Sequence, residues 1–324
     1  MLDASPELSH PARPTLDGLP RPSAMKTFHV DCELDYDVVR QSVFVFNLGA
    51  ASTPHQRVIA EEMVVGPGVV LDEFFDEVGH NRFHRANVAP GSFSIRYRAT
   101  VELEPPWTDT AAQEIALANL PGRVLSYLQS SRYCEVESTY AFALRRFGGI
   151  LAGYGRVQAI CEWIRTNVDY LIGSSTVTSG ARDVLANRAG VCRDFAHLGI
   201  TLCRALNIPA RFVTAYTQYE DPPPDFHAVF EAFLGDRWHL FDPTGLAPVE
   251  DLVRIGTGRD ASDVSFSTFF GAATLRRLSP LVAVAAPGEL LASLQTPTSG
   301  IVMDAVSAPM AQPWTLPSGA SPAS

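Results

Sequence analysis

Three short segments, in a fixed order along the chain, constrain its fold more than any other feature. Cys192 follows Gly190-Val191 and opens a segment whose apolar residues recur at spacings of three and four, which predicts a helix that ends at Asn207. His227 comes 35 residues later, at the start of a predicted strand, and Asp242 comes 15 residues after it, at the end of the next strand. A cysteine, a histidine and an aspartate in such contexts can form a thiol nucleophile, its base and the group that orients the base.

The start of a helix suits a nucleophilic cysteine. Cys192 would lie at the positive end of the helix dipole, where a thiolate is favoured. The backbone N–H groups of the same turn have no helical partners, so they can bind an oxyanion. His197 is a rival base, but it follows Cys192 by five residues, which is about 500° of rotation around the helix. We therefore expect a structural role for His197 and place Cys203, three turns after Cys192, in the core.

The loop Gly235-Asp236 predicts a two-residue β-hairpin and fixes which histidine can meet the aspartate. The pairing set by this turn places Val229 opposite Asp242, so His227 becomes the diagonal neighbour of Asp242 on the same face, at about 7–8 Å between backbones. His239 falls on the other face of the hairpin. The pattern therefore selects His227 as the base and Asp242 as its partner.

Other charged residues near these segments are expected to act structurally. Asp194 suits the first turn of the predicted helix, where a negative charge is favoured. Glu231 shares the face of His227 and is expected to pair with a nearby arginine. Arg259, Asp260 and Asp263 are expected to form a charge cluster that fixes a loop.

Together these segments resemble the bacterial transglutaminase-like family, whose members are described as proposed cysteine proteases within the transglutaminase superfamily. The resemblance covers most of the chain, from the β-rich N-terminal region onward. Its most specific segments are 125–133, 178–185, 190–197, 208–212 and 258–264. The ordered set is far more specific than any one of its pieces.

The resemblance implies an α+β fold with a papain-related transglutaminase-like core, in which the catalytic cysteine starts a helix and the histidine and aspartate lie on adjacent strands. Carried over residue by residue, Cys192 matches the nucleophile, His227 the base and Asp242 the orienting acid. Two positions depart from the family: relatives often have Trp where this chain has Val229, and many have Gly where it has Ala215. Neither position belongs to the triad. Because Val229 is smaller than the Trp of relatives, the shape of a substrate pocket cannot be inferred from those relatives.

The chain divides into four expected parts. Residues 1–25 are rich in proline and are expected to be a flexible leader. Residues 26–104 are expected to form an antiparallel β-sandwich, since 93–103 alternates strictly between apolar and polar side chains. The transglutaminase-like core is expected at 105–287, and the Pro/Ala/Ser-rich segment 288–324 as a disordered tail.

Composition narrows the class of partner and the compartment. The formal net charge of −10 and the pI near 5.3 disfavour binding to nucleic acid. No apolar run approaches the ~20 residues of a membrane helix. The N-terminus lacks a basic segment followed by an apolar core, so we do not expect it to be a secretory signal. Five cysteines, an odd number, fit a reducing cytoplasm better than a disulfide framework. The chain lacks zinc-site and EF-hand spacings, so we expect no metal and no cofactor.

The function expected from these residues is acyl transfer on amide bonds through a cysteine thioester, with a peptide or protein amide as the substrate. Hydrolysis and transamidation remain open, because the triad is the same for both. The alternative is a non-catalytic peptide-binding or scaffold protein with a vestigial triad, although all three residues are present. A structural protein that acts through its N-terminal β-region is a third reading.

Overall fold

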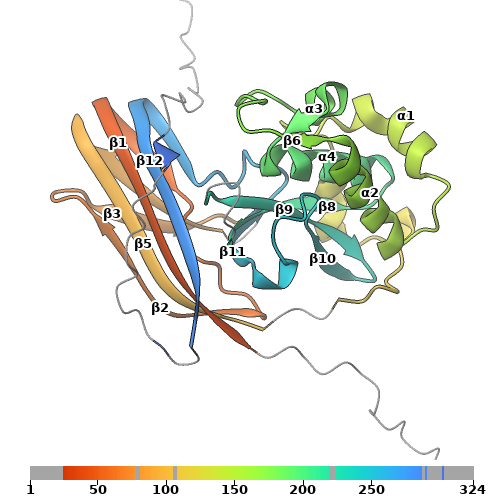
Figure 1. Cartoon of the computed structure of the whole chain (residues 1–324), viewed down its shortest axis with the longest axis horizontal. Coiled ribbons are helices and arrows are strands. Elements are labelled where there is room, and N and C mark those ends of the chain that lie inside the picture. The colour runs from red at the N-terminus through yellow and green to blue at the C-terminus, as the bar shows by residue number, and fades with distance from the viewer. Residues whose placement is uncertain are drawn as a thin grey trace, which may run out of the picture.

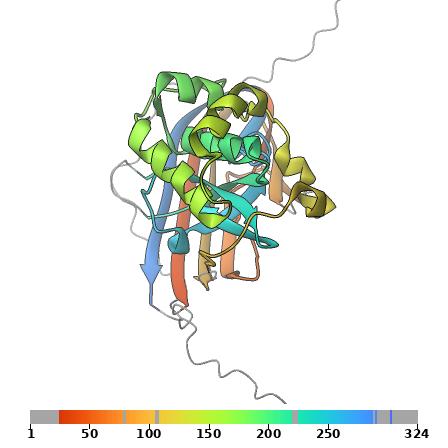
Figure 2. The same ribbon diagram turned by 90° about the vertical axis from the view of Figure 1, so that its right-hand side faces the viewer.

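The molecule consists of a sheet of long strands and a mixed core of helices and shorter strands, which lie side by side (Figure 1). The computed structural model describes residues 25–77, 81–104, 108–218, 224–286 and 289, and the short strand at 301–302. Turned by 90°, the helices of the core lie in front of the long strands (Figure 2). The α+β class and the transglutaminase-like core are confirmed.

All pairings among the described strands of the long-stranded sheet are antiparallel, and β1 is its central strand. One side of β1 pairs with β12 along almost its whole length, and the other side pairs first with β5 and then with β4. β2 pairs with β5, β3 with β4, and β13 with β12. The strands are β1 (Lys26–Phe46), β2 (Gln56–Val65), β3 (Leu71–Phe75), β4 (Arg82–Val88), β5 (Gly91–Leu103), β12 (Ser267–Ala285) and β13 (Ile301–Val302).

Alternating apolar residues place one face of this sheet against the core. In β5 the side chains at odd positions from Phe93 to Leu103 are buried, as the alternation in the sequence predicts. The even positions of the first half of β1 are buried on the same face, and an aromatic group around Phe44 continues it. Tyr216 and Ile255 of the core belong to the same buried cluster as these strands, so β8 and β11 pack against the sheet, while the helices of the core surround a separate cluster.

The strands of the expected β-sandwich at 26–104 belong to one hydrogen-bonded sheet, which also includes β12 from far along the chain. The expected core range of 105–287 therefore contains a strand, 267–285, that returns to the first sheet. The expected leader at 1–25 and tail at 288–324 lie almost wholly outside the described residues.

The core packs four helices with a four-stranded antiparallel sheet in the order β10-β9-β8-β11. Helix α4 is buried along its length except at Arg193, and its Gly199 lies against the ring of Phe230 on β9. A short parallel pair joins β6 to β7 just before α4. The helices are α1 (Val136–Phe147), α2 (Tyr154–Asn167), α3 (Ala181–Asn187) and α4 (Cys192–Ala205). The strands are β6 (Asp169–Tyr170), β7 (Ala189–Gly190), β8 (Ala210–Tyr216), β9 (His227–Leu234), β10 (Arg237–Phe241) and β11 (Val253–Gly258).

Three 3₁₀ segments complete the described elements: η1 (Leu117–Asn119), η2 (Gly122–Leu128) and η3 (Val249–Asp251). The buried face of α2 carries Val157, Ile160, Cys161, Trp163 and Ile164, and the helix ends at Asn167. α1 and α2 lie on the side of the core farthest from the long-stranded sheet (Figure 1). Among the described residues, no helix combines the length and apolar character needed to cross a membrane.

Candidate active site

Cys192 is the first residue of α4, as predicted, and the helix start is held in place by Asp194. The Asp194 carboxylate is fully buried and accepts hydrogen bonds from the Val191 N–H (3.0 Å), the Ser175 hydroxyl and the Arg193 guanidinium (2.9 Å). The Val191 carbonyl in turn accepts the Phe195 N–H at 3.0 Å. The structural role expected for Asp194 is confirmed, because its carboxylate binds an N–H group that the helix itself leaves unpaired.

The predicted hairpin brings His227 to Asp242. Both turn residues, Gly235 and Asp236, have positive φ (54° and 63°), which is typical of a type I′ turn. Leu234 pairs with Arg237, so the register is the one expected. His227 Nε2 lies 2.9 Å from Asp242 Oδ2, and both side chains are buried.

The turn after β10 keeps Asp242 ionised. Asp242 Oδ1 accepts hydrogen bonds from the Thr244 N–H (2.8 Å) and the Thr244 hydroxyl (2.7 Å), and the Ala247 N–H reaches Oδ2 at 3.4 Å. Burial on its own would raise the pKa of Asp242. The hydrogen bond to His227, the charge of His227 and the hydrogen bonds from Thr244 together lower this pKa below its ordinary value. Asp242 is therefore a carboxylate that can orient His227 and stabilise its protonated form.

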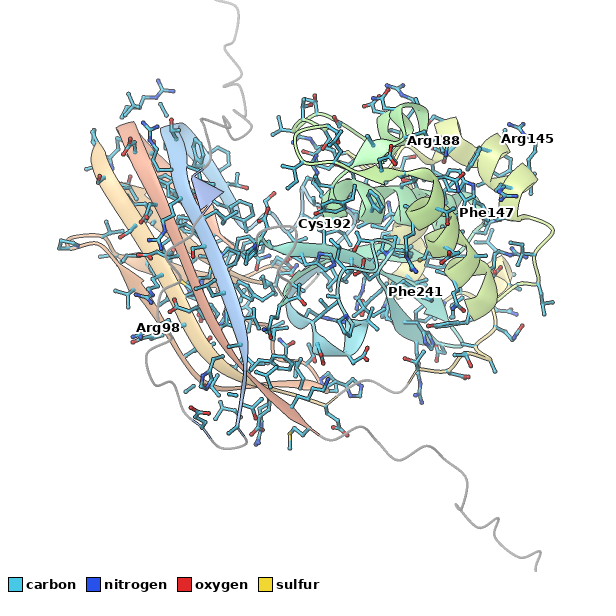
Figure 3. All side chains as sticks on the ribbon, viewed as in Figure 1. Arg98, Arg145, Phe147, Arg188, Cys192 and Phe241 are labelled. Atoms are coloured by element: carbon cyan, nitrogen blue, oxygen red, sulfur yellow. The ribbon has the colours of Figure 1, made fainter. Side chains whose placement is uncertain are left out.

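His227 connects the carboxylate to the thiol. Burial alone would lower the pKa of His227, but hydrogen bonds to Asp242 and Cys192, and the charges of both groups, raise it to about 10. The Cys192 thiol also lies 3.7 Å from the carbonyl oxygen of Phe226, the residue before His227. Cys192 lies on the side of the core that faces the long-stranded sheet (Figure 3). The structure thus brings the three predicted residues together, with a protonated imidazole that can stabilise a thiolate.

The two rival histidines lie elsewhere. His197 is stacked between the rings of Tyr133 and Phe212, with 5.0 Å between centroids on each side, and its Nε2 accepts the Ala261 N–H at 3.1 Å. Burial lowers the pKa of His197 to about 3. His239 pairs with Ala232 and packs beside Tyr154, as the hairpin register predicts. Neither histidine is placed to accept the Cys192 proton.

Comparisons with known proteins agree with the fold. Residues 140–243 match the family model described as the transglutaminase-like superfamily, and residues 25–123 match the bacterial transglutaminase N-terminal domain. The crystal structure of a proposed cysteine protease from Cytophaga hutchinsonii is 37% identical, with a TM-score of 0.78, over 87% of this chain and 95% of that one. The chain belongs to the transglutaminase-like superfamily.

Two mycobacterial proteins are among the relatives of this chain. An uncharacterized protein of Mycobacterium leprae is 30% identical over 177 residues, which is 51% of this chain and 62% of the relative. An uncharacterized protein of Mycobacterium tuberculosis is 30% identical over 190 residues, which is 54% of this chain and 51% of the relative. The chain therefore spans between half and two thirds of the length of these relatives.

Tyr170 is a residue beside the transglutaminase-like triad that the sequence did not reveal. It lies on β6, which pairs in parallel with β7, so that Tyr170 stands opposite Gly190 and close to Cys192. Burial, the largest cause, and the Cys192 charge raise the pKa of its hydroxyl, which interacts with both the backbone N–H and the thiol of Cys192. Two-residue strands have no periodicity, so no sequence pattern predicts this contact.

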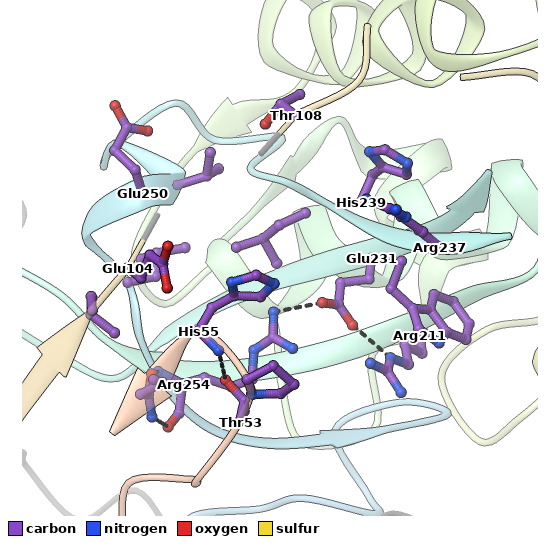
Figure 4. A pocket seen from close by; sticks show the side chains of 17 residues that line it. Thr53, His55, Glu104, Thr108, Arg211, Glu231, Arg237, His239, Glu250 and Arg254 are labelled. Atoms are coloured by element: carbon purple, nitrogen blue, oxygen red, sulfur yellow. Dashed lines mark hydrogen bonds and ion pairs between the residues drawn. The ribbon is translucent and has the colours of Figure 1, made fainter. Parts of the chain in front are cut away.

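A cavity of about 700 Å³, whose lining includes no triad residue, lies between the long-stranded sheet and the core (Figure 4). Its core side carries Glu231, which is buried and accepts hydrogen bonds from Arg211 (2.6 Å) and Arg254 (2.5 Å). Burial alone would raise the pKa of Glu231, but the two arginines lower it. The expectation that Glu231 pairs with an arginine is confirmed. The loop cluster is confirmed in part: Arg259 binds Asp263 at 2.9 Å, whereas the Asp260 carboxylate accepts hydrogen bonds from the Tyr133 N–H and the Ser262 hydroxyl.

Proposed function

We propose that the protein catalyses acyl transfer on amide bonds of peptides or proteins, through a thioester on Cys192. The observation that carries the proposal is the chain of contacts from Asp242 through His227 to the thiol at the start of α4. The family supports a thiol-dependent activity in general terms. The finer assignment rests on the geometry of these three side chains.

The reaction follows from the properties of each group. Transfer of the Cys192 proton to His227 precedes the attack, and Asp242 stabilises the imidazolium of the resulting pair. The thiolate attacks the amide carbonyl carbon, and the carbonyl π electrons move to the oxygen. The Cys192 N–H can donate a hydrogen bond to the oxyanion that results. When the C–N bond breaks, His227 gives its proton to the leaving nitrogen. A second acceptor then attacks the thioester and restores the thiol.

The acceptor determines the name of the reaction. Water releases a carboxylic acid, which makes the protein a protease or amidase, and a primary amine forms a new amide, which makes it a transamidase. The triad treats both alike, because acceptor choice depends on pocket shape and on exclusion of water.

The proposal is tested by trapping the acyl-enzyme. The intact protein is mixed with p-nitrophenyl acetate and analysed by mass spectrometry, and we expect one acetyl group on Cys192. Cys192→Ala should abolish this product, whereas Cys161→Ala, which keeps the triad, should still form it if it remains folded by circular dichroism. Peptide substrates with and without an added primary amine then separate hydrolysis from transfer. Peptide binding without any acyl-enzyme would instead support the non-catalytic reading.

A further inference from the structure

Tyr170 is held next to the nucleophile by backbone pairing, although it lies 22 residues before it in the chain. In the parallel pair of β6 and β7, Tyr170 stands opposite Gly190, and the Leu171 N–H donates to the Gly190 carbonyl at 2.9 Å. Gly190 precedes Cys192 by two residues. The position of the Tyr170 backbone is therefore tied to the start of α4.

The side chain of Tyr170 points toward the same helix start. Its ring packs against Phe195 in the first turn of α4, with 5.7 Å between centroids. Its hydroxyl interacts with the Cys192 N–H and with the Cys192 thiol. A half-buried phenol in this position remains protonated at neutral pH, because burial and the neighbouring sulfur raise its pKa, so it can donate a hydrogen bond.

A thioester mechanism needs hydrogen-bond donors where charge develops on the carbonyl oxygen. The Cys192 N–H is one, since it precedes Asp194 and Phe195, the first residues of α4 whose N–H groups bind the Val191 carbonyl. The nearby Phe226 carbonyl is an acceptor and cannot serve. The Arg193 guanidinium is directed to Asp194 and to the Thr176 carbonyl.

We propose that the Tyr170 hydroxyl is the second donor of the oxyanion site, beside the Cys192 N–H. The inference rests on the proposed function. As Sγ of Cys192 bonds to the carbonyl carbon, the π electron pair moves to the oxygen, which accepts hydrogen bonds from both donors. The pair returns to the carbon when the C–N bond breaks, and the leaving nitrogen takes its proton from His227. Tyr170 keeps its own proton throughout.

The test compares a reaction that creates an oxyanion with one that does not. Acylation by p-nitrophenyl acetate passes through a tetrahedral oxyanion, whereas alkylation by iodoacetamide displaces iodide at a saturated carbon. Tyr170→Phe keeps the ring on Phe195 and removes only the hydroxyl. We expect acylation of Cys192 in this variant to slow by about 100-fold or more, which is the loss typical of one missing oxyanion donor. The rate of alkylation should stay within about threefold of that of the unaltered protein.

Tyr140→Phe is the matched control, because Tyr140 is an exposed tyrosine on α1. It should react like the unaltered protein in both assays. Unfolding temperatures of both variants show whether a loss comes from misfolding, and an equal loss in both reactions would assign Tyr170 a merely structural role and overturn the inference.

The remaining outcomes are also decisive. Equal acylation of Tyr170→Phe and the unaltered protein would overturn the inference and leave the proposed function intact. Faster acylation would show that the hydroxyl obstructs the site rather than serving it. If the unaltered protein forms no acyl-enzyme while iodoacetamide still labels Cys192, the proposed function fails, and the role of Tyr170 fails with it.

Discussion

The five cysteines differ in the exposure of their thiols and in how burial shifts the pKa of each thiol. All five are free and buried, yet Cys192 is 8% exposed whereas the others are between 0 and 4% exposed. Burial raises the pKa of each of the other four thiols, that of Cys134 to about 11. They therefore stay protonated and unreactive at neutral pH, because the thiolate is the nucleophile.

This contrast predicts selective labelling. Iodoacetamide at pH 7 should modify Cys192 well before any other cysteine of the folded protein, because only this thiol lies beside a protonated imidazole. Peptide mapping by mass spectrometry over a series of times measures the order. Labelling of Cys192 at the rate of an ordinary thiol, or after another cysteine, would contradict its assignment as the nucleophile.

The two histidines of the hairpin provide a matched pair of variants. His227→Ala removes the base and should slow formation of the acyl-enzyme by about 100-fold or more, the range of general base catalysis. His239→Ala removes a side chain that packs beside Tyr154 and should change the rate little. Rates of acetylation by p-nitrophenyl acetate measure both. Equal losses in the two variants would mean that the thiol does not depend on His227.

At this scale, short-range geometry made the triad predictable. A two-residue turn fixes the register of Leu234 and Arg237, and that register alone relates His227 to Asp242. Tyr170 could not be predicted in the same way. Its contact with Cys192 depends on a two-residue parallel pairing between segments joined through α3, and no local pattern encodes it.

The packing interface between α4 and β9, called the seam below, positions Cys192 relative to His227. Gly199 lies so near β9 that an added Cβ would stand 2.6 Å from the Phe230 ring. Phe230 is fully buried and cannot move aside freely. Because Cys192 is on α4 and His227 on β9, any displacement at this seam separates the thiol from the imidazole.

We therefore predict that Gly199→Ala destabilises the protein by about 1–3 kcal/mol, the usual effect of overpacking, and also slows acylation of Cys192. Gly155→Ala is the control, since Gly155 is on α2 and an added Cβ would meet no atom within 4 Å. It should be neutral or slightly stabilising. Urea denaturation and the acetylation rate measure the two effects. Unchanged stability in Gly199→Ala would show that the seam can relax.

Elements formed from neighbouring segments were predictable, and those formed from distant ones were not. The alternation of residues 93–103 and the hairpin turn each describe one element or its nearest partner. The pairing of β1 with β12 joins Thr27 to Ala285 across the whole core. Alternation indicates that a strand has a buried face, but it does not identify the partner strand, which is why the pairing of β1 with β12 was not predicted.

Stability of the whole molecule should depend on pH through its buried histidines. The folded-state pKa of His197 is about 3, below the ordinary value of 6.5 that the unfolded chain would have. Between these pH values the unfolded state binds a proton at His197 that the folded state does not. The contribution of His197 to the free energy of unfolding is therefore complete above pH 6.5 and declines as the pH falls toward 3. His227, whose folded pKa is raised to about 10, has the opposite sign and loses its contribution only between pH 6.5 and 10.

We expect the free energy of unfolding to fall by about 1.4 kcal/mol per pH unit below 6.5 from His197 alone. His197→Gln should be less stable at pH 7 but lose less stability between pH 6.5 and 5. Urea titrations of both proteins across this range provide the comparison, which removes the contributions of His84 and His239, whose pKa values burial also lowers. Parallel pH dependences in the two proteins would contradict this account.

Independence from metal ions is the last expectation, and it concerns the whole distribution of acidic side chains. Calcium needs six to eight oxygen ligands gathered around one point. The acidic stretch in β3 alternates across the strand, and its side chains are already paired, Asp72 with Arg85 and Glu73 with Arg82 and His84. The second stretch, 220–225, is described only at 224 and 225, and burial raises the pKa of Asp225 to about 6. Alkylation of Cys192 and acyl transfer should therefore survive EDTA unchanged, because the oxyanion donors proposed above are a backbone N–H and a hydroxyl, which need no metal ion. Loss of acylation in EDTA and its recovery with calcium would overturn this, and Glu220, Asp221 and Asp225 would be the first side chains to replace.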